Sequence, residues 1–109
     1  MLKWCIVALA LLTCLRADPI AASENALRGK FAFNWFTDPD KTTCVRIGNK
    51  LMAMLSSARF HCDSNPRRDT ASGAPASVCS SVDRKSEYMI FATFAACETE
   101  RKTQAANGD

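Results

Sequence analysis

The chain has 109 residues, of which 14 are Lys or Arg and 11 are Asp or Glu, so its formal net charge is +3. This length is enough for one domain, and so mild a charge argues against nucleic acid or an anionic membrane as the main partner. The sequence contains no G-x-S-x-G, P-loop or H-E-x-x-H pattern, so no common catalytic motif points to an enzyme.

Residues 1–22 have the features of a secretory signal peptide. Lys3 precedes the apolar run WCIVALALLTCL (residues 4–15), and small residues lead to Ala22, where we place cleavage. The run is shorter than the roughly 20 residues of a membrane-spanning helix, and no second run follows it. A second interpretation makes residues 11–14 (LLTC) a bacterial lipobox with a lipid on Cys14. Both interpretations predict a secreted or periplasmic protein without a membrane span.

The expected mature domain, residues 23–109, begins with a short polar segment and then an aromatic strand. Without Lys3, Arg16 and Asp18 this domain keeps 12 basic and 10 acidic residues, a net charge of +2. In residues 31–36 (FAFNWF), Phe31, Phe33 and Trp35 alternate with the period of a half-buried strand, which predicts that these three belong to the core.

Residues 43–57 (TCVRIGNKLMAMLSS) are predicted to form one amphipathic helix. Apolar residues recur at spacings of three and four, although a Gly-Asn pair in the middle weakens the pattern. The alternative is a hairpin of residues 31–36 with 42–47, followed by a shorter helix capped by Asn49. Before either of them, Asp38 and Pro39 have the pattern of a helix start.

The second half of the chain is predicted to contain a loop, a hairpin and a helix. Residues 59–62 form a brief strand, and the Pro- and Gly-containing stretch 63–77 forms a long loop. Residues 78–82 and 87–93 form a hairpin whose second arm is apolar on both faces, as in a central strand. Residues 94–107 form an alanine-rich helix with a thin apolar stripe, which a disulfide through Cys97 would attach to the domain.

Four cysteines remain after the signal peptide, and an even number in a small exported chain indicates disulfide bonds. They are Cys44, Cys62, Cys79 and Cys97. We favour the pairs Cys44–Cys62 and Cys79–Cys97, which would tie the first helix to the segment after it and the hairpin to the last helix. The main alternative is Cys44–Cys97 with Cys62–Cys79. The expected fold is a small disulfide-stapled α+β domain with three or four mostly antiparallel strands and two helices.

Several residues of catalytic type have simpler structural explanations. His61 and Cys62 are adjacent in an extended segment and point to opposite faces, so the histidine does not serve the thiol as a base. No closely spaced cysteine pair suggests a zinc site. The carboxylate pairs Asp38/Asp40 and Glu98/Glu100 fit helix capping and a solvated helix surface. We therefore predict no catalytic residues, no metal and no cofactor.

The candidate binding residues are Arg67, Arg68, Phe36 and Tyr88. The two arginines lie in the long loop and could enter the pocket of a trypsin-like enzyme or pair with a phosphate or carboxylate; the simpler interpretation is a solvated loop, partly neutralised by its aspartates. Phe36 and Tyr88 could leave the sheet face away from the helices partly apolar, as a contact patch.

The sequence therefore favours a non-enzymatic exported module that binds a protein. An inhibitor or immunity-type protein of a bacterial periplasm is the first hypothesis, and a secreted effector or toxin that acts on a host is the second. A small enzyme with an unrecognised site is the third.

Overall fold

The computed structural model describes residues 26–108, so the expected signal peptide and the lipid site at Cys14 lie outside the described residues. Within this range a five-stranded antiparallel sheet has the strand order β2-β1-β5-β4-β3. The elements in chain order are β1 (Phe31–Asn34), the 3-10 helix η1 (Pro39–Lys41), β2 (Val45–Arg46), α3 (Asn49–Leu55), β3 (Phe60–Arg67), β4 (Ala76–Ser81), β5 (Glu87–Phe91) and α4 (Phe94–Asn107).

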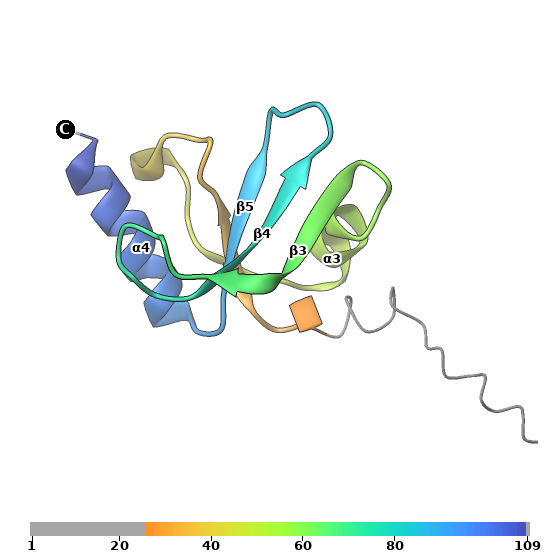
Figure 1. Cartoon of the computed structure of the whole chain (residues 1–109), viewed down its shortest axis with the longest axis horizontal. Helices are drawn as coiled ribbons and strands as arrows, with labels where there is room; N and C mark the ends of the chain where they lie inside the picture. Colours follow the sequence, from red (N-terminus) through yellow and green to blue (C-terminus); the bar gives the residue numbers. More distant parts are fainter. Residues whose placement is uncertain (1–25, 109) are drawn as a thin grey trace, which may run out of the picture.

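Over the part of the chain that the structure describes, these elements confirm the α+β class, with helices α3 and α4 and two disulfides. Helix α4 and helix α3 lie on opposite sides of the sheet (Figure 1), so our expectation that both helices cover one face was wrong. The reason is that side chains of β1 and β5 point alternately to the two faces of the sheet and are apolar on both. A sheet with two apolar faces must bury each of them against another element. Among residues 26–108 the structure has no helix with the length and hydropathy of a membrane span.

The segment 43–57 does not form one helix. Val45 and Arg46 pair with β1 as the short edge strand β2, which is also why the sheet has five strands rather than three or four. The backbone of Ile47 pairs with the segment before β1, and Gly48 precedes the helix in an extended conformation. The alternative of a hairpin and a shorter helix is therefore correct, with Gly48 rather than Asn49 at the N-cap. Long-range strand pairing outweighed the local helical spacing.

Strand β5 is central, as its apolar pattern predicted, and its side chains alternate between two clusters. Met89 and Phe91 face α4, whereas Tyr88 and Ile90 face α3. In β1 the buried Phe33 faces α4, but Trp35 lies just beyond the strand and is 39% exposed, which corrects its assignment to the core. The hairpin β4–β5 and helix α4 confirm the sequence predictions closely, and η1 starts at the Asp38 cap as expected.

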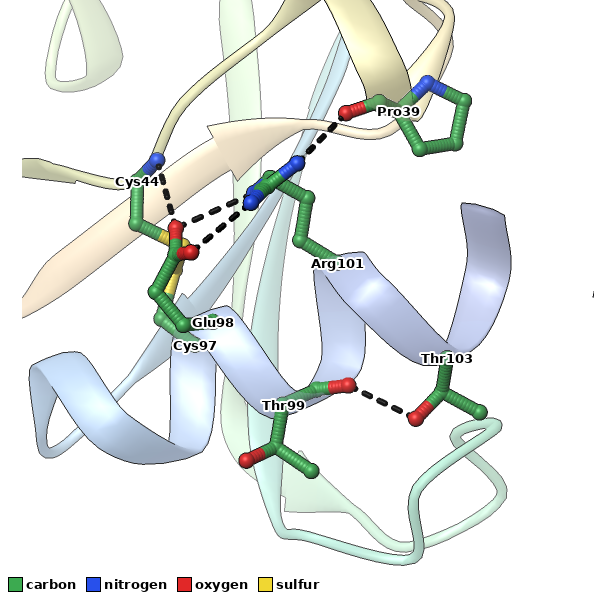
Figure 2. Close-up of polar contacts among 7 residues, drawn as sticks. All are labelled: Pro39, Cys44, Cys97, Glu98, Thr99, Arg101 and Thr103. Atoms are coloured by element: carbon green, nitrogen blue, oxygen red, sulfur yellow. Dashed lines mark hydrogen bonds and ion pairs between the residues drawn. A yellow bond between two sulfur atoms is a disulfide. The ribbon is translucent and has the colours of Figure 1, made fainter. Parts of the chain in front are cut away.

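The four cysteines form the pairs Cys44–Cys97 and Cys62–Cys79, so the favoured pairing was wrong and the alternative is correct. Cys62 and Cys79 lie directly opposite each other on β3 and β4. Cys44 precedes β2 and faces α4, where it bonds to Cys97 (Figure 2). The error followed from the helix predicted over 43–57, which would have turned Cys44 toward the returning strand. The bond through Cys97 does attach α4 to the domain.

Candidate functional site

Helix α4 covers only part of its side of the sheet. The strand register places four residues in one row across the sheet. The backbone N–H of Trp35, directly after β1, donates to the carbonyl of Glu87 in β5. Glu87 lies opposite Ser80 in β4, which lies opposite His61 in β3. Side chains two residues further along each strand, such as Phe33 and Met89, are buried under the helix. The outermost row is thus a polar and aromatic strip that remains accessible.

The indole ring of Trp35 is exposed but held in place. Its Nε1–H donates to Oε1 of Glu87 at 2.8 Å, and the hydroxyl of Ser80 donates to Oε2 of the same carboxylate. The backbone N–H of Glu87 donates in turn to Oδ1 of Asn34 at 3.2 Å. Phe36, 48% exposed, packs against Trp35 edge to face with ring centroids 5.2 Å apart. An exposed aromatic pair therefore rests on a fixed network of hydrogen bonds.

A pocket of about 410 Å³ opens beside this strip, between the sheet, the 68–75 loop and the second half of α4. A volume in this range is typical of ligand sites. The sheet contributes Trp35, Arg67, Val78, Glu87 and Met89, the loop contributes Asp69, Thr70 and Ala71, and the helix and its end contribute Glu100, Gln104, Asn107 and Gly108.

Glu100 forms the buried wall of this pocket, which corrects its assignment to a solvated helix surface. Only 1% of the residue is exposed. Its carboxylate accepts hydrogen bonds from the backbone N–H groups of Ala71 (3.1 Å) and Ser72 (2.8 Å) and from Nε2 of Gln104 (2.7 Å). Burial alone would raise the pKa of Glu100, but the hydrogen bonds from Ser72, Gln104 and Ala71 outweigh burial and leave the pKa lowered. The carboxylate is therefore anionic at neutral pH.

Of the two predicted arginines, one reaches the pocket. Arg67 ends β3 rather than lying in a loop, because β3 continues to this residue with a register shift after Asp63. Its guanidinium donates to both carboxylate oxygens of Asp69, at 3.1 and 2.7 Å, which raises the pKa of Arg67 and lowers that of Asp69. Arg68 is exposed and is not among the residues around the pocket.

Phe36 and Tyr88 do not share a patch as predicted. Phe36 lies beside Trp35 and lines a second pocket, of about 610 Å³, with His61, Val82 and Arg84. Tyr88 is on the other face, where its ring packs on Phe60 with centroids 6.0 Å apart and lines a separate pocket with residues of β2 and α3.

The row that contains His61, Ser80 and Glu87 resembles a hydrolase triad only in its residue types. In such a triad the histidine accepts the serine proton and the acid orients the histidine. Here the serine hydroxyl donates directly to the carboxylate, and no hydrogen bond of the His61 ring is found within residues 26–108. The sulfur of Cys62 is bonded to Cys79, so it is not a thiol nucleophile. In the same range no group of three or more potential ligands could hold a metal ion.

No protein-family model, no curated protein and no solved structure matches this chain. The site is therefore interpreted from its geometry. The sequence missed Glu87, Ser80 and Glu100 as site residues. One signal for Glu87 was available, since it is the only charged residue in a strand that is otherwise apolar on both faces. For Glu100 the i,i+4 spacing to Gln104 was such a signal.

Proposed function

We propose that this chain is an exported, non-enzymatic module that binds another protein through what we call the Trp35 surface, formed by Trp35, Phe36, Val82, Arg84 and His61. The observation that carries the proposal is the aromatic pair. Trp35, Phe36 and Val82 are exposed by 39%, 48% and 67%, yet the indole ring is fixed by Glu87. Exposed large apolar residues in one group are typical of contact surfaces.

The chemistry of this surface supports a protein partner. Tryptophan and arginine are the residue types that contribute most to binding energy at protein interfaces. A side chain that is already held in one orientation loses little freedom on binding, and this raises affinity. The two disulfides fit an extracellular or periplasmic location. An inhibitor or immunity-type role in a bacterial periplasm is the form of this function that we favour.

The test is capture of a partner by wild-type protein and by Trp35→Ala, from the periplasm of the producing cell and from host extracts in parallel. We expect Trp35→Ala to weaken capture about 30-fold, the effect of losing a central interface residue. Phe94→Ala is the matched control, since Phe94 is an aromatic residue that is 51% exposed and packs on Phe31 away from this surface. Its capture should equal that of wild type.

The source of the captured protein decides between the two forms of the proposal. Capture from the producing cell supports an inhibitor or immunity-type protein, and capture from host extract alone supports a secreted effector. Capture that Trp35→Ala and Phe36→Ala leave unchanged would contradict the proposed surface.

A further inference from the structure

The pocket beside the Trp35 surface is acidic in a basic protein. Its charged residues are the carboxylates of Asp69, Glu87 and Glu100 and the guanidinium of Arg67, so their formal charge is −2. The 109-residue sequence has a formal charge of +3. The pocket thus concentrates negative charge against the overall sign, and a concave site with low-dielectric walls strengthens that local field.

Glu100 makes this charge unusual because it is buried without a cation. Its three hydrogen-bond donors are two backbone N–H groups and one side-chain amide, all of them neutral. Within residues 26–108 no lysine or arginine forms an ion pair with Glu100 or Glu87, and the one guanidinium in the pocket is engaged by Asp69. Buried charges in proteins are usually paired as well as hydrogen-bonded, so the negative charge of Glu100, which is hydrogen-bonded but not paired, attracts a cation that enters the pocket.

Two further features of the walls favour a cation. Trp35 contributes its indole ring, and cations bind more strongly to tryptophan than to other aromatic rings. Asn107 and Gly108, at the carboxyl end of the 14-residue helix α4, form another part of the wall. The unpaired carbonyl groups at this end of a helix carry partial negative charge.

We infer that this pocket receives the ammonium or guanidinium end of a Lys or Arg side chain of the bound protein. The inference rests on the proposed function, because Trp35 and Glu87 connect the pocket to the Trp35 surface. Trp35 belongs to both, and Glu87 lines both this pocket and the second pocket, which Phe36 also lines. A protein seated on Trp35 and Phe36 would therefore cover the mouth of the pocket and exclude water from the ion pair. Exclusion of water strengthens such a pair relative to one on an open surface.

The test uses small probes and the protein purified from cells that express the whole 109-residue sequence. Lysine and arginine blocked at both ends are titrated while the indole N–H signal of Trp35 is followed by NMR; the signal is assigned by its loss in Trp35→Phe. Blocked norleucine is the neutral analogue of the lysine probe, and methyl glucoside tests for a saccharide. We expect saturable shifts with the two cationic probes alone.

Substituting either partner of the Arg67–Asp69 ion pair tests how the affinity for the cationic probes depends on the charge of the pocket. Asp69→Asn reduces the pocket charge to about −1 and should weaken the cationic probes about threefold to fivefold, whereas Arg67→Gln increases it to about −3 and should strengthen them by a similar factor. Both changes break the same contact, so a purely structural role would move both variants in one direction. Asp40→Asn removes an exposed carboxylate outside the pocket and should have no effect.

Equal binding of norleucine, binding of the glucoside alone, or shifts of the same sign in Asp69→Asn and Arg67→Gln would overturn the inference. The captured partner separates this failure from that of the proposed function. Partner capture that depends on Trp35 but is unchanged in Asp69→Asn and Arg67→Gln overturns the inference alone. Capture that does not depend on Trp35 overturns the proposed function, whatever the small probes show.

Discussion

Two carboxylates lie two residues apart on α4, on opposite sides of the helix, and their surroundings differ in charge. Glu98 faces β2 and η1, where it accepts two hydrogen bonds from Arg101, at 2.8 and 3.0 Å, and a longer one from the backbone N–H of Cys44. Arg101 also donates to the carbonyl of Pro39 at 2.8 Å (Figure 2). Glu100 faces the 68–75 loop and meets neutral donors instead.

The comparison shows how a helix with a thin apolar stripe is held on the sheet. On one side a disulfide and an ion pair attach the helix, and the charges of this ion pair neutralise each other. On the other side a buried anion holds a loop through hydrogen bonds, and its negative charge stays unpaired in the wall of a pocket. The first arrangement explains stability alone, whereas the second combines stability with a site that a cation can occupy. The following experiments separate the two sides.

The largest effect is expected from Cys44→Ala combined with Cys97→Ala. This disulfide joins residues 53 apart in sequence, and its loss should lower the free energy of unfolding by about 4 kcal/mol, because the unfolded chain gains the freedom of a long loop. Urea unfolding followed by far-UV circular dichroism measures the change. The control is the pair Cys62→Ala and Cys79→Ala, at a separation of 17, for which about 3 kcal/mol is expected. A larger loss in the control would contradict the proposed importance of the α4 attachment.

Glu100→Gln should have the next largest effect, a loss of about 1–3 kcal/mol in the free energy of unfolding at pH 7. An amide keeps one acceptor but turns its NH₂ group toward a backbone N–H of the loop, which leaves a buried donor without a partner. Trypsin cleavage after Arg67 and Arg68 should become faster as the loop loosens. Unchanged cleavage and unfolding would mean that Glu100 does not hold the loop.

The pH dependence of this variant follows from the lowered pKa of Glu100. A carboxyl with a lower pKa in the folded state stabilises the protein above its unfolded pKa of about 4.3, and that contribution is lost as the pH falls through the folded pKa. The difference in unfolding free energy between wild type and Glu100→Gln should therefore be constant near neutral pH and shrink below about pH 4. A difference that grows on acidification would contradict an anionic Glu100.

Gly73→Ala should have a smaller effect of about 1 kcal/mol. Gly73 has a φ of +82°, and nothing lies within 4 Å of an added Cβ atom, so the cost comes from the backbone conformation rather than from a clash. Urea unfolding measures it. Gly48→Ala is the control, since Gly48 also has open space around it but a negative φ of −101°, and it should change stability less. Equal effects would mean that the positive φ of the loop is not what matters.

The parts of this molecule that were predictable from sequence are those determined by neighbours in the chain. The hairpin of β4 and β5 has a local turn, and α4 combines helix-forming residues with a clear stop, so both were predicted closely. The prediction of one helix over residues 43–57 was wrong for two reasons. Part of this segment pairs with β1, a strand that lies earlier in the chain, and the spacing of its apolar residues also fits a helix. The cysteine pairing failed as a consequence of that one error.

The site was harder to predict because it depends on register. Glu87, Ser80 and His61 come from three strands and Trp35 directly follows a fourth, β1, and only the pairing of those strands places them in one row. The burial of Glu100 depends on where the 68–75 loop crosses α4, which no local pattern specifies. Arg67 was identified as a binding candidate from its residue type, but its place beside an acidic pocket required the structure.

The smallest effect, and the one that distinguishes the two carboxylates most directly, is expected from Glu98→Gln. The Glu98–Arg101 pair is partly exposed, so its loss should reduce the free energy of unfolding by about 0.5–1 kcal/mol. The hydrogen bond from Arg101 is the main cause of the lowered pKa of Glu98, so this contribution, like that of Glu100, is present above about pH 4.3 and lost on acidification.

The two carboxylates should differ in how the effect of their substitution on stability depends on salt. Raising NaCl to about 1 M should reduce the effect of Glu98→Gln more than that of Glu100→Gln, whose donors are neutral. Unfolding of both variants at low and high salt measures this, and an equal salt dependence would mean that Glu100 has a cationic partner in solution.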